Sequence, residues 1–265
     1  MKTQIRLNYV VPHGVSGPEA GAMNIIYEFL LNEYRQNAYS YISINQIGDD
    51  LNEVIIKNGK QVYLNIRYPS PKDFELREDE DKNRIRLEII HSGLMRLAEK
   101  EKKLDIQSLH GIRDKILANK FSFDFVCKTY ENKKNKNLGA KLIVRPETNR
   151  FKYYVQIEER GQLKCKISIY EGSTSGYYIA DLFKFGKWKN DNNFVLTGKR
   201  HDVEIHIYID QCKAEYVNLT PYEKAPFFEM FRSDISSEEK EIAIKNFEHS
   251  LPSAIRAIIK KADNQ

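Results

Sequence analysis

Apolar side chains recur with several periods along the chain, and each period predicts a different kind of element. Alternation over residues 5–11 predicts a first strand, and an apolar stripe over residues 19–36 predicts a helix. Three more strands are expected at residues 39–47, 54–57 and 61–67. The last two flank the pair Asn58-Gly59, which strongly favours a hairpin turn. The N-terminal part of the chain is therefore expected to form a β-α-β-β-β unit.

The longest segment rich in apolar residues, residues 83–103, predicts a central helix. Its apolar positions form one stripe and also occupy nearly the opposite side, as shown by Leu87, Ile90, Leu94, Ile85 and Ile89. A helix that is apolar around most of its circumference is usually buried between two layers. The acidic run at residues 75–81 is expected to be a solvated linker that favours the helix N-terminus. A second helix is expected at residues 105–119, which gives a buried central pair.

From residue 121 onward the period of the pattern changes to two. Apolar and polar positions alternate in about eight short segments, which is typical of an antiparallel meander with one buried and one solvated face. Helices are expected from Ser236, where Ser236 and Glu239 match a capping box. The sequence therefore predicts an α+β fold: an N-terminal β-α-β-β-β unit, a central buried helix pair, and a large antiparallel β-meander packed against C-terminal helices.

These changes of pattern divide the chain into four segments. The expected segments are an N-terminal α/β unit at residues 1–72, central helices at 73–120, an antiparallel sheet at 121–220 and C-terminal helices at 221–265. The four segments can also share one core as a single compact domain, because 265 residues suit one large domain or two small ones.

Composition narrows the class of protein. The chain is 41% hydrophobic, 11% aromatic and 30% charged, which supports a folded core with a solvated surface and argues against disorder. The net charge of +5 arises from 42 basic and 37 acidic residues, a small excess that does not by itself indicate nucleic-acid binding. No apolar stretch approaches the length of a membrane span, and we expect no signal peptide at the N-terminus.

The chain contains three cysteines, Cys127, Cys165 and Cys212. They are far apart in the sequence, and no Cys-x-x-Cys pair is present. This spacing argues against a disulfide framework and against a cysteine zinc site. All three are expected in strands as buried, reduced thiols, which favours a cytoplasmic protein.

The strongest chemical pattern lies in the segment HDVEIHIYID, where alternation places Asp202, Glu204 and His206 on one face of a strand. Two carboxylates and an imidazole at this spacing can bind a divalent metal or act as acid and base. Glu88 and His91, three residues apart in the central helix, form a second candidate pair. Both patterns also fit structural roles, a solvated strand face for the first and an intrahelical Glu–His pair for the second.

Aromatic residues and lysines are interleaved over residues 177–194. Tyr178, Phe185, Trp188 and Lys187 are candidate binding residues, because rings beside cations can stack on the bases of single-stranded nucleic acid or form a protein interface. Most of these rings also fit the core. Trp188, which is flanked by lysines, is expected to be partly exposed.

A glycine-rich loop separates the first strand from the first helix. A helix N-terminus offers free amides to anions, so His13 and Ser16 in this loop are candidate binding residues. The glycines match neither a dinucleotide-binding nor a phosphate-binding motif, and a simple turn explains them as well. No Ser-His-Asp or Cys-His arrangement stands out, and no nucleophile-elbow motif is present.

Three functional hypotheses follow. The first is a non-catalytic cytosolic protein that binds another protein without a cofactor, such as a bacterial toxin-neutralising (immunity-type) or accessory protein. Its basis is the absence of a catalytic motif and a surface rich in aromatic and charged residues. The second is a metal-dependent hydrolase or nuclease that uses the acidic and histidine residues named above. The third is a nucleic-acid-binding protein that uses Lys133, Lys134 and Lys136 with the Trp188 region.

Overall fold

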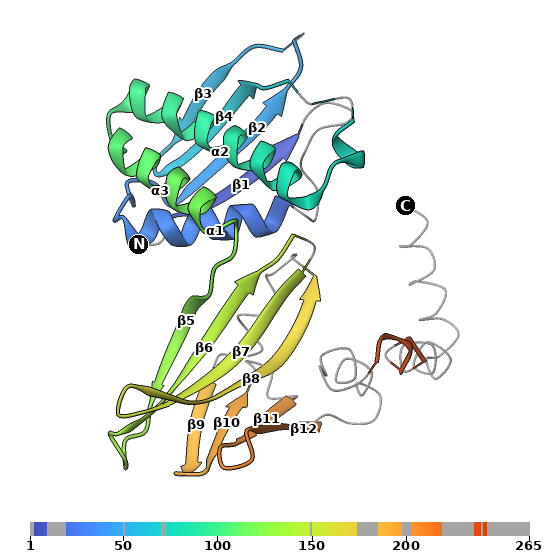
Figure 1. Cartoon of the computed structure of the whole chain (residues 1–265). Coiled ribbons are helices and arrows are strands. Elements are labelled where there is room, and N and C mark those ends of the chain that lie inside the picture. The colour runs from blue at the N-terminus through green and yellow to red at the C-terminus, as the bar shows by residue number, and fades with distance from the viewer. Residues whose placement is uncertain are drawn as a thin grey trace, which may run out of the picture. The chain divides into compact units, whose positions relative to one another are not determined.

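The computed structural model describes residues 3–9, 20–49, 51–69, 71, 73–148, 150–173, 185–197, 203–218, 236–239 and 241–242 (Figure 1). The fold of this part of the chain is α+β, as predicted. Unit 1 comprises the described parts of Met1–Phe125, Arg145–Phe151 and Ser173–Ser175, and unit 2 comprises those of Val126–Val144, Lys152–Gly172 and Gly176–Gln265. The finer division into four segments stays a prediction.

Unit 1 begins with the predicted β-α-β-β-β order. Its elements are β1 (Gln4–Tyr9), α1 (Ala20–Glu33), β2 (Tyr41–Ile47), β3 (Val54–Asn58), β4 (Gln61–Arg67), the short 3-10 helix η1 (Phe74–Leu76), α2 (Asp79–Glu101) and α3 (Ile106–Ala118). The strands form one sheet in the order β1-β2-β4-β3, in which β1, β2 and β4 are parallel and β3 is antiparallel to β4. The helix α1 supplies the crossover connection that the parallel neighbours β1 and β2 require.

The predicted hairpin joins β3 and β4, but its turn lies one residue further along than the sequence suggested. Asn58 is still part of β3 and pairs with Gln61, so the two-residue loop is Gly59 and Lys60. Gly59 has a φ of +59°, the left-handed conformation that a two-residue hairpin loop needs at its first position.

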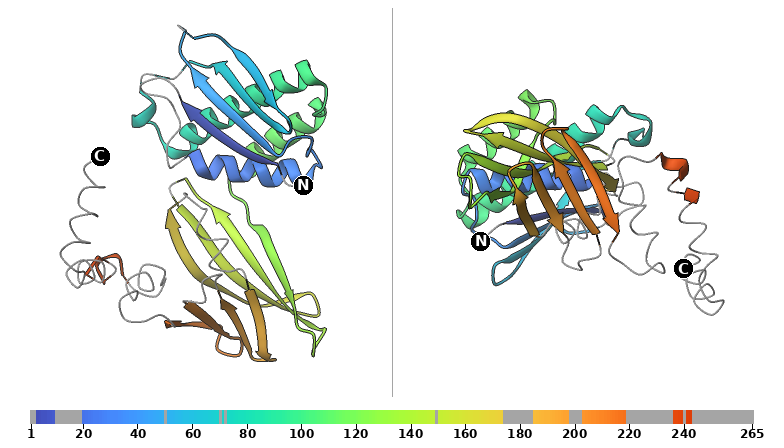
Figure 2. Two further views of the ribbon diagram at one scale, coloured as in Figure 1. Left: turned by 180° about the vertical axis from the view of Figure 1, so that it is seen from behind. Right: turned by 90° about the horizontal axis from the view of Figure 1, so that it is seen from below.

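The helices α2 and α3 lie on one face of the first sheet, and none of the described helices lies on the other face (Figures 1 and 2). Gly93 allows α2 to approach β2 closely, because a Cβ atom there would lie 3.0 Å from Cγ2 of Ile44. The predicted central pair is confirmed, and its core side chains are fully buried. The acidic run is mostly helical and not a linker, because Glu75 lies in η1 and Asp79 to Asp81 form the first turn of α2. Its carboxylates lie at the helix N-terminus, as predicted, where they interact favourably with the helix dipole.

Unit 2 contains most of the predicted antiparallel region. Its strands are β5 (Phe125–Glu131), β6 (Leu138–Pro146), β7 (Arg150–Glu159), β8 (Gln162–Ser173), β9 (Phe185–Asn190), β10 (Asn193–Thr197), β11 (Val203–Tyr208) and β12 (Lys213–Asn218). The first four strands each have one or two end residues that belong to unit 1. They form two four-stranded sheets, β5-β6-β7-β8 and β12-β11-β10-β9, each with its strands in sequence order. The predicted meander is therefore divided between two sheets.

Side chains connect the two sheets of unit 2. The Tyr130 ring of β5 lies 5.2 Å from the Phe194 ring of β10. Gly186 of β9 makes room for both rings, because a Cβ atom there would lie 2.6 Å from Cε1 of Tyr130 and 2.7 Å from Cζ of Phe194. The Tyr216 hydroxyl of β12 donates to the carbonyl of Ile169 in β8, at 2.8 Å. The absence of a side chain at Gly186 is thus a requirement of the packing.

The C-terminal helices are described only near their expected start. The capping box is confirmed: the Ser236 amide donates to Glu239 Oε2 at 2.6 Å, and the Glu239 amide donates to Ser236 Oγ at 3.1 Å. The remainder of the expected C-terminal helices lies outside the described residues. Of the helices that are described, none is long and apolar enough to span a membrane.

The cysteines are free thiols, but one of them is misplaced by the sequence prediction. Cys127 is half-buried in β5 and Cys165 is buried in β8, whereas Cys212 is exposed in the turn between β11 and β12. Burial, together with the neighbouring Cys212 thiol, raises the pKa of Cys165 to about 12. The prediction of three buried thiols in strands is confirmed for Cys165. Cys127 lies in a strand but is only half-buried, and the prediction is wrong for Cys212, because β12 begins only at Lys213.

Candidate functional site

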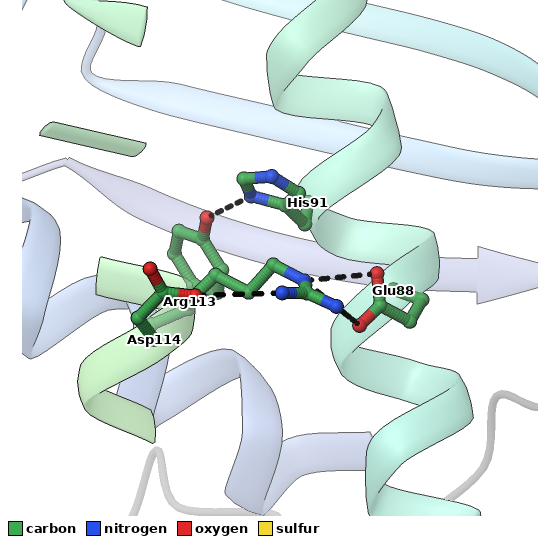
Figure 3. A network of polar contacts seen from close by, with 5 residues as sticks. Glu88, His91, Arg113 and Asp114 are labelled. Atoms are coloured by element: carbon green, nitrogen blue, oxygen red, sulfur yellow. Dashed lines mark hydrogen bonds and ion pairs between the residues drawn. The ribbon is translucent and has the colours of Figure 1, made fainter. Parts of the chain in front are cut away.

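Glu88 and His91 do not form the pair that their spacing suggested (Figure 3). Among the described residues, each has its own partner on another helix. Glu88 of α2 binds Arg113 of α3, with Oε1 2.9 Å from Nε and 2.6 Å from the nearer terminal nitrogen. The His91 ring nitrogen Nδ1 lies 3.0 Å from the hydroxyl of Tyr27 in α1. These two contacts join α1, α2 and α3.

The surroundings of His91 favour a neutral imidazole. Burial, and then the neighbouring His110 ring at 5.2 Å, lower the pKa of His91. Burial raises the pKa of the Tyr27 hydroxyl, so that it keeps its proton and can donate to Nδ1. The arrangement holds two helices together through a buried hydrogen bond, and no carboxylate among the described residues is hydrogen-bonded to the imidazole. It therefore supports a structural role for this network.

The strand β11 presents its side chains as predicted: Ile205 and Ile207, and Ile209 directly after the strand, are buried, and the residues between them are half-buried. His206 Nε2 lies 3.0 Å from Glu204 Oε2. Asp202, the third candidate ligand, lies outside the described residues. Within the described ranges no three His, Cys, Asp or Glu side chains gather closely enough to hold a metal ion. The metal site stays a prediction that rests on one imidazole–carboxylate contact.

The aromatic candidates of β9 face opposite sides of their sheet. Trp188 is half-buried, its ring lies 5.1 Å from that of Phe194, and its Nε1 donates to the Tyr130 carbonyl at 3.4 Å. Phe185 and Lys187 are exposed and alternate with Trp188 along the strand, so they lie on the opposite face. Trp188 is thus partly exposed, as predicted, but its ring packs between the sheets. Tyr178, His13 and Ser16 lie outside the described residues.

A pocket of about 300 Å³ opens beside the first turn of α2 in unit 1. Its lining residues are Ala22, Met23, Ile26, Asp79, Glu80, Asn83, Lys120, Phe121, Ser122, Arg145, Pro146, Glu147 and Thr148. The side-chain amide of Asn83 donates to Thr148 Oγ1 at 3.0 Å, and Arg145 forms a bidentate ion pair with Asp124. Charges of both signs line the pocket and several are already paired, so the lining specifies no ligand.

The edge strand β1 is covered by a row of polar side chains from α1. The backbone amides of Leu7, Ile5 and Thr3 donate to side-chain oxygens at 3.2, 2.6 and 3.1 Å. The acceptors are, in the same order, Asn24, Glu28 and Asn32. An edge strand otherwise offers such amides to another chain. The helix therefore satisfies the donors along this edge from within the same molecule.

The geometry of α1 and β1 explains why side chains of the helix can accept backbone amides at three successive positions. Successive acceptors are four residues apart on the helix, a rise of about 6 Å. Successive donors are two residues apart on the strand, a rise of about 6.6 Å. The two spacings nearly match, and the order of the pairs shows that α1 runs antiparallel to β1, as Figures 1 and 2 show.

The opposite edge of the same sheet is open. Among the described strands, β3 pairs only with β4. The exposed apolar side chains here are Leu51, Val54, Ile56 and Tyr63, which we call the β3 edge surface; they are 36%, 38%, 58% and 37% exposed. Ile56 and Tyr63 are direct cross-strand partners, and Val54 lies on the same face of β3 as Ile56. Exposed apolar side chains on an unpaired edge are typical of an interaction site.

An amide ladder lies beside the β3 edge surface on the uncovered face of the sheet. The Asn8 side chain donates to Asn45 Oδ1 at 3.1 Å, and the Asn45 side chain donates to Asn65 Oδ1 at 2.9 Å. These residues occupy one register position across β1, β2 and β4, and Val54 of β3 continues the row. The uncovered face thus changes from polar at β1 to apolar at β3.

Sequence reasoning missed both the covered edge and the β3 edge surface. A signal for the second was present, because the run Val54, Ile55 and Ile56 places apolar residues on both faces of a short strand. Such a run in a strand with one solvated face leaves an apolar side chain exposed. No protein-family model, no curated protein and no solved structure matches the chain.

Proposed function

We propose that the chain is a non-catalytic protein-binding protein whose partner binds at the β3 edge surface. The observation that supports the proposal is the contrast within one sheet. Side chains of α1 accept amides along β1, whereas no strand in the described part of the chain pairs with the outer side of β3, which carries Ile56, 58% exposed. We propose further that the chain acts in the bacterial cytoplasm, as a toxin-neutralising (immunity-type) or accessory protein.

The chemistry of this surface fits a protein better than a small molecule. An unpaired edge strand can bind an extended segment through backbone hydrogen bonds, while pockets and apolar side chains set the specificity. Tyr63 supplies an amphipathic ring of the kind enriched at the centres of protein interfaces. Ile56 and Val54 add aliphatic contact area that would leave water on binding.

The observations at the other candidate residues support a catalytic function less. Glu204 and His206 are in contact, but the third residue of that pattern lies outside the described part of the chain. Glu88 and His91 are engaged in contacts between helices. A binding function requires none of these groups to be free.

The test is affinity capture from the host lysate with the wild-type chain and with Ile56→Glu, followed by mass spectrometry. A carboxylate at this position would be buried without a partner in the interface, so we expect at least a roughly thirtyfold loss of affinity, as at a binding hot spot. The captured protein is then purified and its affinity for both variants is measured by calorimetry.

Val126→Glu is the matched control, because Val126 is an exposed aliphatic residue (48%) on another edge strand, β5. Support for the proposal is one stoichiometric protein that is retained by the wild type and by Val126→Glu and is lost with Ile56→Glu. The proposal is wrong if Ile56→Glu retains its partner as well as the wild type does, or if no protein is retained at all.

A further inference from the structure

Three turns meet at one end of unit 2, which is the lower end in Figure 1. The side chains of Asn132 and Asn135, in the β5–β6 loop, donate to the two carboxylate oxygens of Asp191, in the β9–β10 turn, at 3.0 and 2.9 Å. The Arg160 amide, in the β7–β8 turn, donates to the Asn137 carbonyl at 2.7 Å. Hydrogen bonds therefore hold segments far apart in the sequence in a fixed arrangement.

The β5–β6 loop is organised by its own asparagines. Asn132 is 3% exposed, and its Oδ1 accepts the backbone amides of Lys134 and Asn135 at 3.0 and 3.1 Å. Asn135 Oδ1 accepts the amide of Asn137 at 3.1 Å. In such turns the side-chain oxygen of an asparagine accepts backbone amides two or three residues later, which fixes the loop conformation. Asn132 is buried and Asn135 is half-buried, and the lysines between the asparagines of this loop are exposed.

These turns, together with the strand β9 that leads into one of them, carry a set of exposed cations that we call the basic end surface. Its members are Lys133, Lys134, Lys136, Arg160, Lys187 and Lys189. None of the ion pairs found in the described part of the chain involves any of the six. Three nearby acids are already paired with other lysines, as Glu158 is with Lys141, Glu159 with Lys164 and Glu215 with Lys213.

The remaining acids nearby do not balance these cations. Glu131 and Asp210 are exposed at this end, and the carboxylate of Asp191 already accepts two asparagine amides. Three acids therefore stand against six cations. The small net charge of the whole chain conceals this local excess, because the paired residues elsewhere cancel one another.

We infer that the basic end surface binds the phosphate backbone of a nucleic-acid duplex, independently of protein binding at the β3 edge surface. Two of the rings at this end are not available to stack on bases, since Trp188 and Tyr130 pack against Phe194 between the sheets. The exposed ring of Phe185 lies at the other end of β9, away from the turns. Affinity at a surface of six cations therefore depends mainly on charge. A duplex carries the densest array of phosphates, about one charge per 1.7 Å, so it is the ligand that this surface fits best.

The test measures binding of the full chain to a fluorescein-labelled DNA duplex of mixed sequence by fluorescence anisotropy. Each lysine or arginine that contacts a phosphate releases counterions, so affinity falls steeply with salt. If all six cations make contact, the loss of affinity between about 50 and about 200 mM salt approaches a thousandfold. Duplexes of different sequence are expected to bind equally well, because the surface contacts no base edge.

Lys134→Glu with Lys136→Glu is the test variant. We expect affinity for the duplex to fall at least tenfold and the salt dependence to lose about one unit of slope per lysine. Lys100→Glu with Lys103→Glu, at the end of α2 in unit 1, changes the net charge by the same amount and is the matched control. We expect it to lower the affinity less than about twofold, because long-range charge is screened.

Four results would overturn the inference. The first is no binding of the duplex at low salt, and the second is an equal loss of affinity in both double variants, which would show a general charge effect. The third is tighter binding of a single strand than of the duplex, which would show recognition of bases. The fourth is tighter binding of an acidic polypeptide such as polyglutamate, which would assign the surface to an acidic protein. Thermal unfolding of both variants verifies that each is folded.

Discussion

The two edges of the first sheet differ in how their backbone donors are satisfied. On β1, the side chains of Asn24 and Glu28 accept two amides along the strand, and Asn32 accepts the amide directly before it. On β3, no described element covers the outer side, and Val54 and Ile56 are exposed. The polar side chains thus lie on the edge that is covered from within, and the apolar side chains lie on the edge that is open.

This difference indicates that the β1 edge stabilises the fold of unit 1, whereas the β3 edge is available to a partner. A buried donor left without an acceptor costs the full desolvation of that group, so the covered edge should be sensitive to substitution. An exposed side chain loses little burial when it is changed, so the open edge should be tolerant. Substitutions of one kind on both edges can therefore test the comparison directly.

The largest effect is expected from Asn32→Leu. This change leaves the amide of Thr3, a residue that is 1% exposed, without its acceptor. We expect the free energy of unfolding to fall by about 1–3 kcal/mol. Urea denaturation followed by circular dichroism measures the change.

Asn58→Leu is the matched control on the open edge, because Asn58 is an exposed asparagine at the end of β3. We expect it to change the free energy of unfolding by less than about 0.5 kcal/mol. Equal losses in the two variants would show that the side chains of α1 contribute nothing specific to the covered edge.

An effect of the opposite sign, which depends on pH, is expected from Glu28→Gln. Burial raises the pKa of Glu28 to about 7, although the Ile5 amide and Arg6 act in the opposite direction. A raised pKa in the folded state stabilises the fold below the unfolded value of 4.5, and this contribution is lost as the pH rises through about 7. Glutamine keeps the acceptor for Ile5 and does not ionise.

We therefore expect Glu28→Gln to match the wild type near pH 4.5 and to be more stable at pH 8, by at most about 3 kcal/mol. Unfolding curves across this pH range measure the difference. Glu33→Gln is the control, since Glu33 lies on the same helix and pairs with Lys115 at the surface. An unchanged pH dependence in Glu28→Gln would show that the Glu28 carboxyl ionises normally in the folded protein.

Local patterns in the sequence were enough to predict most elements. Alternation at Ile205, Ile207 and Ile209 identified the buried face of β11, and the glycine after Asn58 identified the hairpin. Each of these signals acts within one strand or one turn. The Ser236–Glu239 capping box was also predictable, because both of its hydrogen bonds span only three residues.

The partners of polar side chains were not predictable from spacing. Glu88 and His91 lie three residues apart, yet Glu88 binds Arg113, 25 residues further along, and His91 contacts Tyr27, 64 residues earlier. An exposed pair at that spacing gains only about 0.2–0.5 kcal/mol, so partners on neighbouring helices readily replace it. The packing of the helices therefore decides which residues become the partners of Glu88 and His91.

The candidate surfaces depend on the same long-range information. The polar positions of Asn24, Glu28 and Asn32 are visible in the sequence at a spacing of four, but their partners are backbone amides of another element. The basic end surface depends on hydrogen bonds between Asn132 and Asp191, which are 59 residues apart. Spacing along one element can indicate which side chains share a face, but only the fold brings side chains of different elements together.

The smallest effect on stability is expected from Ile56→Lys, on the open edge. The side chain is largely exposed, and a lysine can extend into solvent from its position opposite Tyr63, so the free energy of unfolding should change by less than about 0.5 kcal/mol. Ile55→Lys is the adjacent control, because Ile55 points to the other face, opposite the buried Leu64, and should cost at least about 1 kcal/mol. Chemical denaturation of both variants measures the difference. A loss in Ile56→Lys as large as that in Ile55→Lys would mean that Ile56 serves the fold of the unit, and the β3 edge would then no longer differ from the covered edge of β1.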